Sequence, residues 1–155
     1  MKKIWAPWRS KFIYDRKQRG CIFCKAAKSK NDRADYVITR DEFCFSILNI
    51  YPYNNGHIMV APYRHKGRLE DLTKGELYGL MLLTEKTTCL LDKILKPDGY
   101  NIGLNIGKIS GAGFPGHLHV HIVPRWQGDT NFMPVLAQAK IISESLGSLY
   151  RRLKK

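Results

Sequence analysis

The stretch that decides the fold is His117-Leu118-His119-Val120-His121-Ile122-Val123, in which histidine alternates with aliphatic residues. This period of two predicts a β-strand, because successive side chains of a strand point to opposite faces of the sheet. We expect one face to carry the three imidazoles and the other to pack into the core. At a rise of about 3.3 Å per residue, the outer two histidines should lie roughly 13 Å apart. They can therefore hardly share one metal ion, so at least one imidazole of the run is not needed as a ligand of that ion and can have another role.

Hydrophobic segments on the N-terminal side predict three further strands. Residues 36–40 and 43–48 are rich in β-branched and aromatic types and are separated by Asp41-Glu42, which favours a hairpin. A third strand is predicted over residues 57–61, ending at Pro62.

The second half of the chain predicts two helices and two strands. Apolar residues recur at helical spacing from Thr73, a suitable N-cap with Glu76 three residues on, to Leu95. Strands are expected near residues 100–106 and 118–123, joined by a glycine-rich turn at 107–116, and a C-terminal helix over 135–153. The whole predicts an α+β fold: an antiparallel sheet of about five strands, one long central helix and a C-terminal helix.

Length and composition predict one domain. The chain has 155 residues, of which 44% are hydrophobic, enough for a single core. We expect one domain over residues 1–155, with 1–20 as an N-terminal arm and 135–155 as a C-terminal helix. The N-terminus is basic but has no apolar run behind it, so we expect a cytoplasmic protein without a signal peptide or membrane partner. Cys44 and Cys89 lie in apolar segments and are predicted to be buried thiols.

The charge favours polyanionic partners. Lys and Arg total 26 against 13 Asp and Glu, a formal net charge of +13. Nucleotides, nucleic acids and acidic membranes all satisfy this preference. The basic residues are spread along the chain, so solvated surface explains part of the excess.

Three histidines on one strand face suggest phosphorus chemistry. Imidazole is largely neutral at pH 7, can attack phosphorus, and forms an adduct that is itself readily attacked. The alternatives are a chance cluster on a solvated face and a site in which every ring binds metal. Three of the five histidines fall within five positions, so chance is the weakest explanation.

The run resembles the signature of the histidine-triad family, and the resemblance covers most of the chain. Asn49, Asn54-Asn55-Gly56-His57 and Asn105-Ile106-Gly107 fall where that family carries its other site residues. Further segments look like the prokaryotic diadenosine tetraphosphate phosphorylase branch of the family: Trp5-Ala6-Pro7-Trp8-Arg9, Leu48-Asn49-Ile50-Tyr51-Pro52-Tyr53, Pro62-Tyr63-Arg64-His65 and Pro124-Arg125-Trp126.

The resemblance implies a role for each catalytic candidate. His119 would attack the α-phosphorus of a nucleotide and carry the nucleotidyl group, and His121 would contact the phosphate beside it. His57 would orient the row, and Asn105 would bind near the scissile phosphate or the leaving group. Taken without the histidine run, Asn105 is better explained as a turn cap.

The resemblance also implies the substrate-binding residues. Asn49 would hold the ribose hydroxyls, with Ile47 and Ile50 as apolar contacts for the base; a turn cap and two core residues are the ordinary alternatives. Many family members carry Gln-Ser or Gln-Thr just before the triad, where this chain has Gly113-Phe114-Pro115-Gly116. Backbone N–H groups at Gly113 could approach a phosphate closely, or the segment could be a flexible turn.

Cys21-Ile22-Phe23-Cys24 has the spacing of a zinc knuckle, but two cysteines supply half of a tetrahedral site. A thioredoxin-type redox pair lacks its usual preceding strand, and a simple pair of buried thiols is the third interpretation. The resemblance implies that His65 and His117 complete the site. Such a closed Cys₂His₂ centre would hold a structural zinc ion, and no organic cofactor is implied.

The resulting hypothesis is a nucleotidyl transferase that cleaves dinucleoside polyphosphates with orthophosphate as acceptor. A hydrolase of dinucleoside polyphosphates or nucleoside phosphoramidates is the first alternative, and a nucleotide-binding regulator the second. A basic nucleic-acid-binding module is the third, for which Trp5, Trp8 and Tyr14 among basic residues give only a weak hint, so nucleic acid is not the expected partner. The resemblance also implies a homodimer or a larger assembly.

Overall fold

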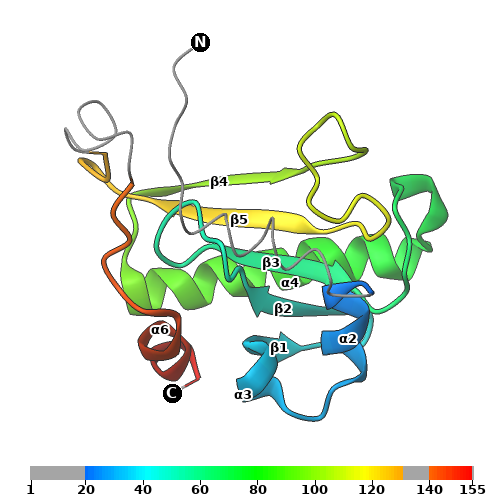
Figure 1. The fold of residues 1–155 in the computed structure, drawn as a ribbon, viewed down its shortest axis with the longest axis horizontal. Coiled ribbons are helices and arrows are strands. Elements are labelled where there is room, and N and C mark those ends of the chain that lie inside the picture. The colour runs from blue at the N-terminus through cyan, green and yellow to red at the C-terminus, as the bar shows by residue number, and fades with distance from the viewer. Residues whose placement is uncertain (1–19, 131–139, 155) are drawn as a thin grey trace.

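A computed structural model of the protein describes residues 20–130 and 140–154. Its centre is a five-stranded antiparallel sheet with strand order β1-β2-β3-β5-β4, as Figure 1 shows. The strands are β1 Val37–Arg40, β2 Cys44–Leu48, β3 Ile58–Pro62, β4 Gly99–Leu104 and β5 Val120–Arg125. The predicted α+β fold is confirmed, including the hairpin between β1 and β2. The arm expected at residues 1–20 lies, apart from Gly20, outside the described residues.

The long helix α4 (Lys74–Leu95) covers one face of the sheet. Its predicted start is confirmed by a capping box: the Thr73 hydroxyl accepts a hydrogen bond from the Glu76 N–H, and the Glu76 carboxylate accepts one from the Thr73 N–H. Buried residues of α4 and the aliphatic residues that alternate with the histidines belong to the larger core cluster, among them Leu80, Leu83, Leu91, Leu118, Val120 and Ile122.

The short helix α2 (Ile22–Lys28) covers part of the opposite face and was not predicted. Its buried residues Phe23 and Ala26, spaced one helical turn apart, join a second apolar cluster with side chains of β1, β2 and β3. A one-turn helix α3 (Asp32–Asp35) and a 3₁₀ turn η1 (Leu69–Asp71) complete the connections. None of the helices in the described part of the chain is both long and apolar enough to cross a bilayer.

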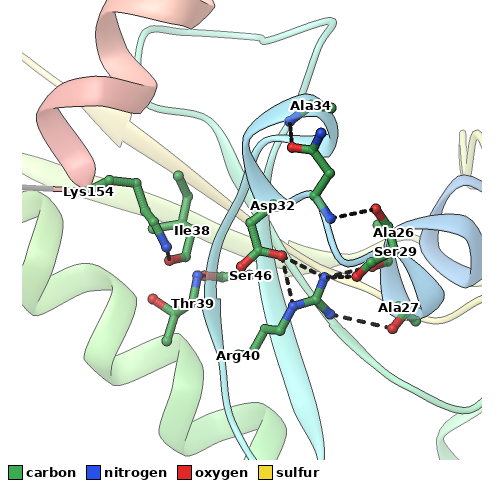
Figure 2. A network of polar contacts seen from close by, with 11 residues as sticks. Ala26, Ala27, Ser29, Asp32, Ala34, Ile38, Thr39, Arg40, Ser46 and Lys154 are labelled. Carbon is green, nitrogen blue, oxygen red and sulfur yellow. Dashed lines mark hydrogen bonds and ion pairs between the residues drawn. The ribbon is translucent and has the colours of Figure 1, made fainter.

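Arg40 of β1 fixes the C-terminal end of α2 to the sheet (Figure 2). Its guanidinium donates to the carbonyl oxygens of Ala26 at 2.8 Å and Ser29 at 3.1 Å, and to the Asp32 carboxylate at 2.8 Å. The last carbonyl groups of a helix have no hydrogen-bond partner within the helix. The Arg40 guanidinium donates hydrogen bonds to such groups, and its positive charge interacts favourably with the negative end of the helix dipole.

Replacement of Arg40 by methionine is expected to lower the free energy of unfolding by about 1–3 kcal/mol, because hydrogen bonds to charged groups contribute about 1.5–3 kcal/mol and this side chain is partly exposed. Urea denaturation measures the change. Arg151→Met, at an exposed position of α6 (Leu146–Leu153), is the matched control. Equal stability of the two variants would contradict the anchoring role.

Three sequence-based expectations need correction. The C-terminal helix begins at Leu146, capped by the Ser145 hydroxyl, while residues 140–145 are not helical and 135–139 lie outside the described residues. Strand β5 begins at Val120 rather than at residue 118, because the first cross-strand pair is Val60–Val120. Cys44 is buried as predicted, whereas Cys89 is exposed. Cys89 lies two positions before the buried Leu91, which on a helix places it on the opposite, solvent-facing side.

Candidate active site and metal centre

The two faces of the histidine run are as predicted. Leu118, Val120 and Ile122 point into the core beneath α4. The imidazole face is not solvated at His117 and His119, however, because Phe23 of α2 packs against these two rings, whereas His121 is partly exposed. The centroid of the Phe23 ring lies 5.0 Å from that of His117 and 4.6 Å from that of His119. His117 and His119 are only 1% and 4% exposed, which argues against a chance cluster on a wet strand.

The protonation of His119 follows from a backbone contact. Its Nδ1 lies 2.8 Å from the carbonyl oxygen of His117. A carbonyl can only accept, so Nδ1 carries the proton and donates it, which leaves the lone pair of the neutral ring on Nε2. Burial lowers the pKa of His119 and keeps the ring uncharged at neutral pH. Nε2 of His119 therefore has the electronic state that a nucleophile needs.

His57 and His121 form a directed chain of hydrogen bonds. The Tyr53 N–H donates to Nδ1 of His57 at 3.1 Å, so Nε2 of His57 bears the proton. That Nε2 lies 2.9 Å from Nδ1 of His121 and donates to it. The neutral His121 ring consequently carries its proton on Nε2, where it is available to a ligand. His57 thus contacts the histidine run through a hydrogen bond to His121, and its orienting role stays a prediction.

Asn49 and Tyr53 hold this chain in place. The Asn49 Oδ1 accepts from the Tyr51 N–H at 2.9 Å, which turns the Nδ2 group toward Nδ1 of His57 at 3.2 Å. The Tyr53 ring lies against both imidazoles, with centroids 4.7 Å from His57 and 5.9 Å from His121. Sequence reasoning missed the roles of Tyr53 and Phe23, although each lies within a motif that it quoted.

Burial, together with a smaller effect of the neighbouring histidines, lowers the pKa of His57 to about 3 and that of His121 to about 4. An unfolded histidine titrates near 6.5, so between that pH and about 4 the unfolded chain binds protons that the folded protein does not. The free energy of unfolding is therefore undiminished above pH 6.5 and decreases as the pH falls below that value. Between pH 7 and pH 5, each of these two histidines should lower the free energy of unfolding by about 2 kcal/mol.

Urea denaturation at the two pH values checks this expectation. His57→Gln removes one titrating ring, so its stability should depend less steeply on pH than that of the native protein. A native protein equally stable at pH 5 and pH 7 would contradict the assignment of neutral, buried rings.

The remaining site candidates are dispersed. Asn105 is half-buried and lies one residue beyond the pair Leu104–Val120, at the start of the loop that leads to the histidines. Gly113 is exposed in that loop, and the neighbouring Phe114 packs edge-on against Phe23 at 6.1 Å. Ile47 is buried in the cluster beneath α2. Ile50 is 42% exposed and lines a cavity with Ile142 and Leu146, and Ile47 is not among the residues that line this cavity.

Four potential metal ligands converge at the N-terminal end of α2. The ligand atoms of Cys21, Cys24, His65 and His117 all lie within 4.8 Å of one another. The Cys21 Sγ is 3.3 Å from Nδ1 of His117, and the Cys24 Sγ is 3.2 Å from Nδ1 of His65. The two Nδ1 atoms are 3.3 Å apart.

These separations fit a tetrahedral metal site. With metal–sulfur bonds of about 2.3 Å and metal–nitrogen bonds of about 2.0–2.1 Å, the ligand atoms of a tetrahedron stand roughly 3.3–3.8 Å apart. The tautomer of His117 is also compatible with a metal site. Its Nε2 lies 2.9 Å from the Pro62 carbonyl oxygen and donates a hydrogen bond to it, so Nδ1 is unprotonated and free to bind metal. His119 and His121 are not part of this cluster, which agrees with the prediction that the outer two histidines of the run cannot share one metal ion.

The antiparallel sheet, the row of imidazoles on one strand and the nearby group of two cysteines and two histidines are together typical of one family of proteins. Comparison with known proteins identifies that family. Residues 30–128 match the HIT domain family model, and the chain belongs to the HIT (histidine-triad) family. It is 35% identical to the AP-4-A phosphorylase of Mycobacterium tuberculosis, over 99% of this chain and 83% of the relative.

Two further relatives bear on the site. The asymmetrical bis(5'-nucleosyl)-tetraphosphatase of Schizosaccharomyces pombe is 35% identical over 65% of this chain and 55% of its own length. A zinc-bound histidine triad family protein from Mycobacterium smegmatis superposes with a TM-score of 0.70 at 27% identity, over 87% of this chain and 91% of that structure.

Proposed function

We propose that the protein is a nucleotidyl transferase that cleaves dinucleoside polyphosphates, such as diadenosine tetraphosphate, with orthophosphate as the acceptor. The observation that carries the proposal is the state of His119: its Nδ1 proton is engaged by a backbone carbonyl, and its Nε2 is unprotonated. Beside it, His121 presents a proton on Nε2. Nucleophile and donor thus lie next to each other, with ring centroids 4.7 Å apart. Likeness to a phosphorylase over nearly the whole chain supports the choice of substrate class.

In the first step, Nε2 of His119 attacks the α-phosphorus, and a phosphorus–nitrogen bond forms. The bond between that phosphorus and the bridging oxygen breaks, and its electron pair leaves with the nucleoside polyphosphate. The Nε2–H of His121 donates to the phosphate oxygens or the departing oxygen, where negative charge develops. Asn105 and the backbone of Gly113 are proposed to contact the oxygens of the scissile phosphate from the loop that follows β4.

In the second step, an oxygen of orthophosphate attacks the phosphorus and the phosphorus–nitrogen bond breaks. Diadenosine tetraphosphate and phosphate are thereby converted to ATP and ADP. Asn49 is proposed to hold the ribose hydroxyls, and Ile47 and Ile50 to flank the base. The exposed side chain of Ile50 is available for that contact, whereas Ile47 would need to be reached from the edge of its cluster.

Product analysis with and without orthophosphate tests the proposal. ATP and ADP that form only when phosphate is present support a phosphorylase. AMP and ATP formed in phosphate-free buffer indicate the hydrolase alternative, which the tetraphosphatase relative favours. Tight nucleotide binding without turnover would leave a regulator, and RNA or DNA affinity that falls steeply with salt would indicate a nucleic-acid module.

We further propose that Cys21, Cys24, His65 and His117 bind a structural zinc ion. The donor set suits zinc, the ligand separations fit a tetrahedron, and the zinc-bound relative has the same fold. Four protein ligands leave no position open for water, so the ion would stabilise the fold and take no part in the phosphoryl chemistry. It would join the start of α2 to the residues just before β5.

The homodimer implied by the family resemblance is proposed to form at the β4 edge. That edge strand carries exposed apolar side chains, with Ile102 49% and Leu104 37% exposed, followed by Ile106 at 45%. An uncovered sheet edge with such residues favours pairing with another chain. Sedimentation equilibrium should give the mass of a dimer, and Ile102→Lys should shift it toward the monomer. A native monomer at micromolar concentration would contradict the proposal.

A further inference from the structure

A cavity of about 240 Å³ lies on the histidine face of the sheet, beyond His121, and is lined by Tyr53, Asn54, Asn101, Val123, Arg125 and Lys140. We propose that it binds the anionic leaving group of the substrate, the nucleoside polyphosphate that departs when His119 is nucleotidylated. This inference rests on the function proposed above and adds to it a site for the distal half of the substrate.

The register of the sheet places the cavity in line with the reacting groups. Along β5, side chains alternate, so His121, Val123 and Arg125 point to the same face while Val120 and Ile122 point into the core. At about 3.3 Å per residue, Arg125 lies roughly 13 Å from His121 along the strand. Figure 1 shows β4 running beside β5 over this whole length. A ligand extended from His121 along β5 therefore meets the cavity.

The neighbouring strand leaves the path open. Gly103 of β4 pairs with His121, and Gly99 pairs with Arg125. A Cβ atom at either glycine would meet no other atom within 4 Å. Asn101, paired with Val123, is the one side chain between them on this face of β4. The route from the imidazoles to Arg125 is thus bordered by backbone and by one amide.

The charged wall of the cavity is held in a fixed arrangement. The Asp129 carboxylate accepts from Nε and Nη2 of Arg125 at 2.6 Å and 3.0 Å, and the Asn101 Oδ1 accepts from Nη1 of Arg125 at 2.8 Å. Asp129 is only 6% exposed and also accepts from Nδ2 of Asn54 at 2.8 Å. The guanidinium therefore has a defined position, which lowers the entropic cost of binding an anion.

The balance of charge favours an anion. Lys140 is the second cation of the wall, with its Nζ 3.9 Å from the Asp129 carboxylate. Two cations face one carboxylate, so the wall carries a net positive charge. Tyr53 lies between this wall and the imidazoles, its ring stacked on His121 and 55% exposed. A substrate without phosphates in its leaving group would react at His119 without reaching the cavity.

The test compares kcat/KM for diadenosine tetraphosphate with kcat/KM for adenosine 5'-phosphoramidate, whose leaving group is ammonia. Lys140→Gln and Asn101→Ala should each lower the ratio of the two values about tenfold, the effect of one lost charge-assisted contact. Lys93→Gln, on the exposed side of α4 across the sheet, is the matched control and should leave the ratio unchanged. Circular dichroism checks that each variant is folded.

The outcomes separate the two proposals. If the native enzyme is active and both cavity variants keep the native ratio within twofold, the cavity does not bind the leaving group, and the proposed function stands. If the native enzyme turns over neither substrate, the proposed function fails, and the inference fails with it. A ratio that also falls in Lys93→Gln would show a general effect of net charge and would overturn the assignment to this cavity.

Discussion

His119→Ala is expected to lower the turnover of diadenosine tetraphosphate by several orders of magnitude, because no other ring of the row combines a free Nε2 with the same position. Nε2 of His121 bears the proton of that ring and can only donate, and His117 lies in the group of candidate metal ligands. The fold should persist with a loss of about 1–3 kcal/mol, since the ring packs against Phe23. Steady-state kinetics and urea denaturation measure the two effects.

His121→Ala is the informative comparison, because it removes the donor and retains the nucleophile. It should remain more active than His119→Ala, and it should accumulate a nucleotidyl group on the peptide that contains His119 if breakdown of the adduct is slowed. Mass spectrometry at alkaline pH, where a phosphoramidate survives, detects that group. Native-rate turnover by His119→Ala would refute the mechanism.

Cys21→Ala is expected to lower the free energy of unfolding by at least about 3 kcal/mol and to abolish bound zinc. The loss should be smaller than the roughly 10–16 kcal/mol associated with zinc-finger peptides. In this protein α2 is also held by Arg40 and by the packing of Phe23, so it does not depend on the metal alone. Elemental analysis should find one zinc ion per native chain.

Cys89→Ala provides the control for this substitution, since Cys89 is exposed on α4 and distant in sequence from the cluster. It should keep both zinc and native stability. A native protein free of zinc, together with native stability of Cys21→Ala, would remove the metal centre from consideration. Activity should fall with zinc loss, because Phe23 lies between the two cysteines and contacts His119 directly.

Local patterns in the sequence predict the framework well. The alternation at 117–123 places the imidazoles and the core residues on their correct faces, and Thr73 with Glu76 fixes the start of α4. In each case the determining interactions are between near neighbours in the chain. The grouping of His65 with the cysteines came from family resemblance, because their sequence separation carries no local signal.

Features that depend on long-range packing were missed or misjudged. Helix α2 is seven residues long and is stable where it is because it covers Phe45 and Met59 on the sheet, which no local propensity encodes. Tyr53 was quoted only as part of a family motif, yet its ring lies against two histidines, His57 just before β3 and His121 in β5. Cys89 was judged from the apolarity of its neighbours, whereas its position around the helix decides its exposure.

The hydrogen bond from Nδ1 of His119 to the His117 carbonyl oxygen affects how well a cationic His119 ring is stabilised. In serine proteases the corresponding imidazole nitrogen donates to a carboxylate, whose full negative charge stabilises the imidazolium. Here the acceptor is a peptide oxygen with only a partial charge. A ring bonded to phosphorus through Nε2 while Nδ1 keeps its proton is cationic, and a peptide oxygen compensates that cation only weakly. In the proposed mechanism the adduct would therefore give up its nucleotidyl group readily, which would speed the second of the two transfer steps.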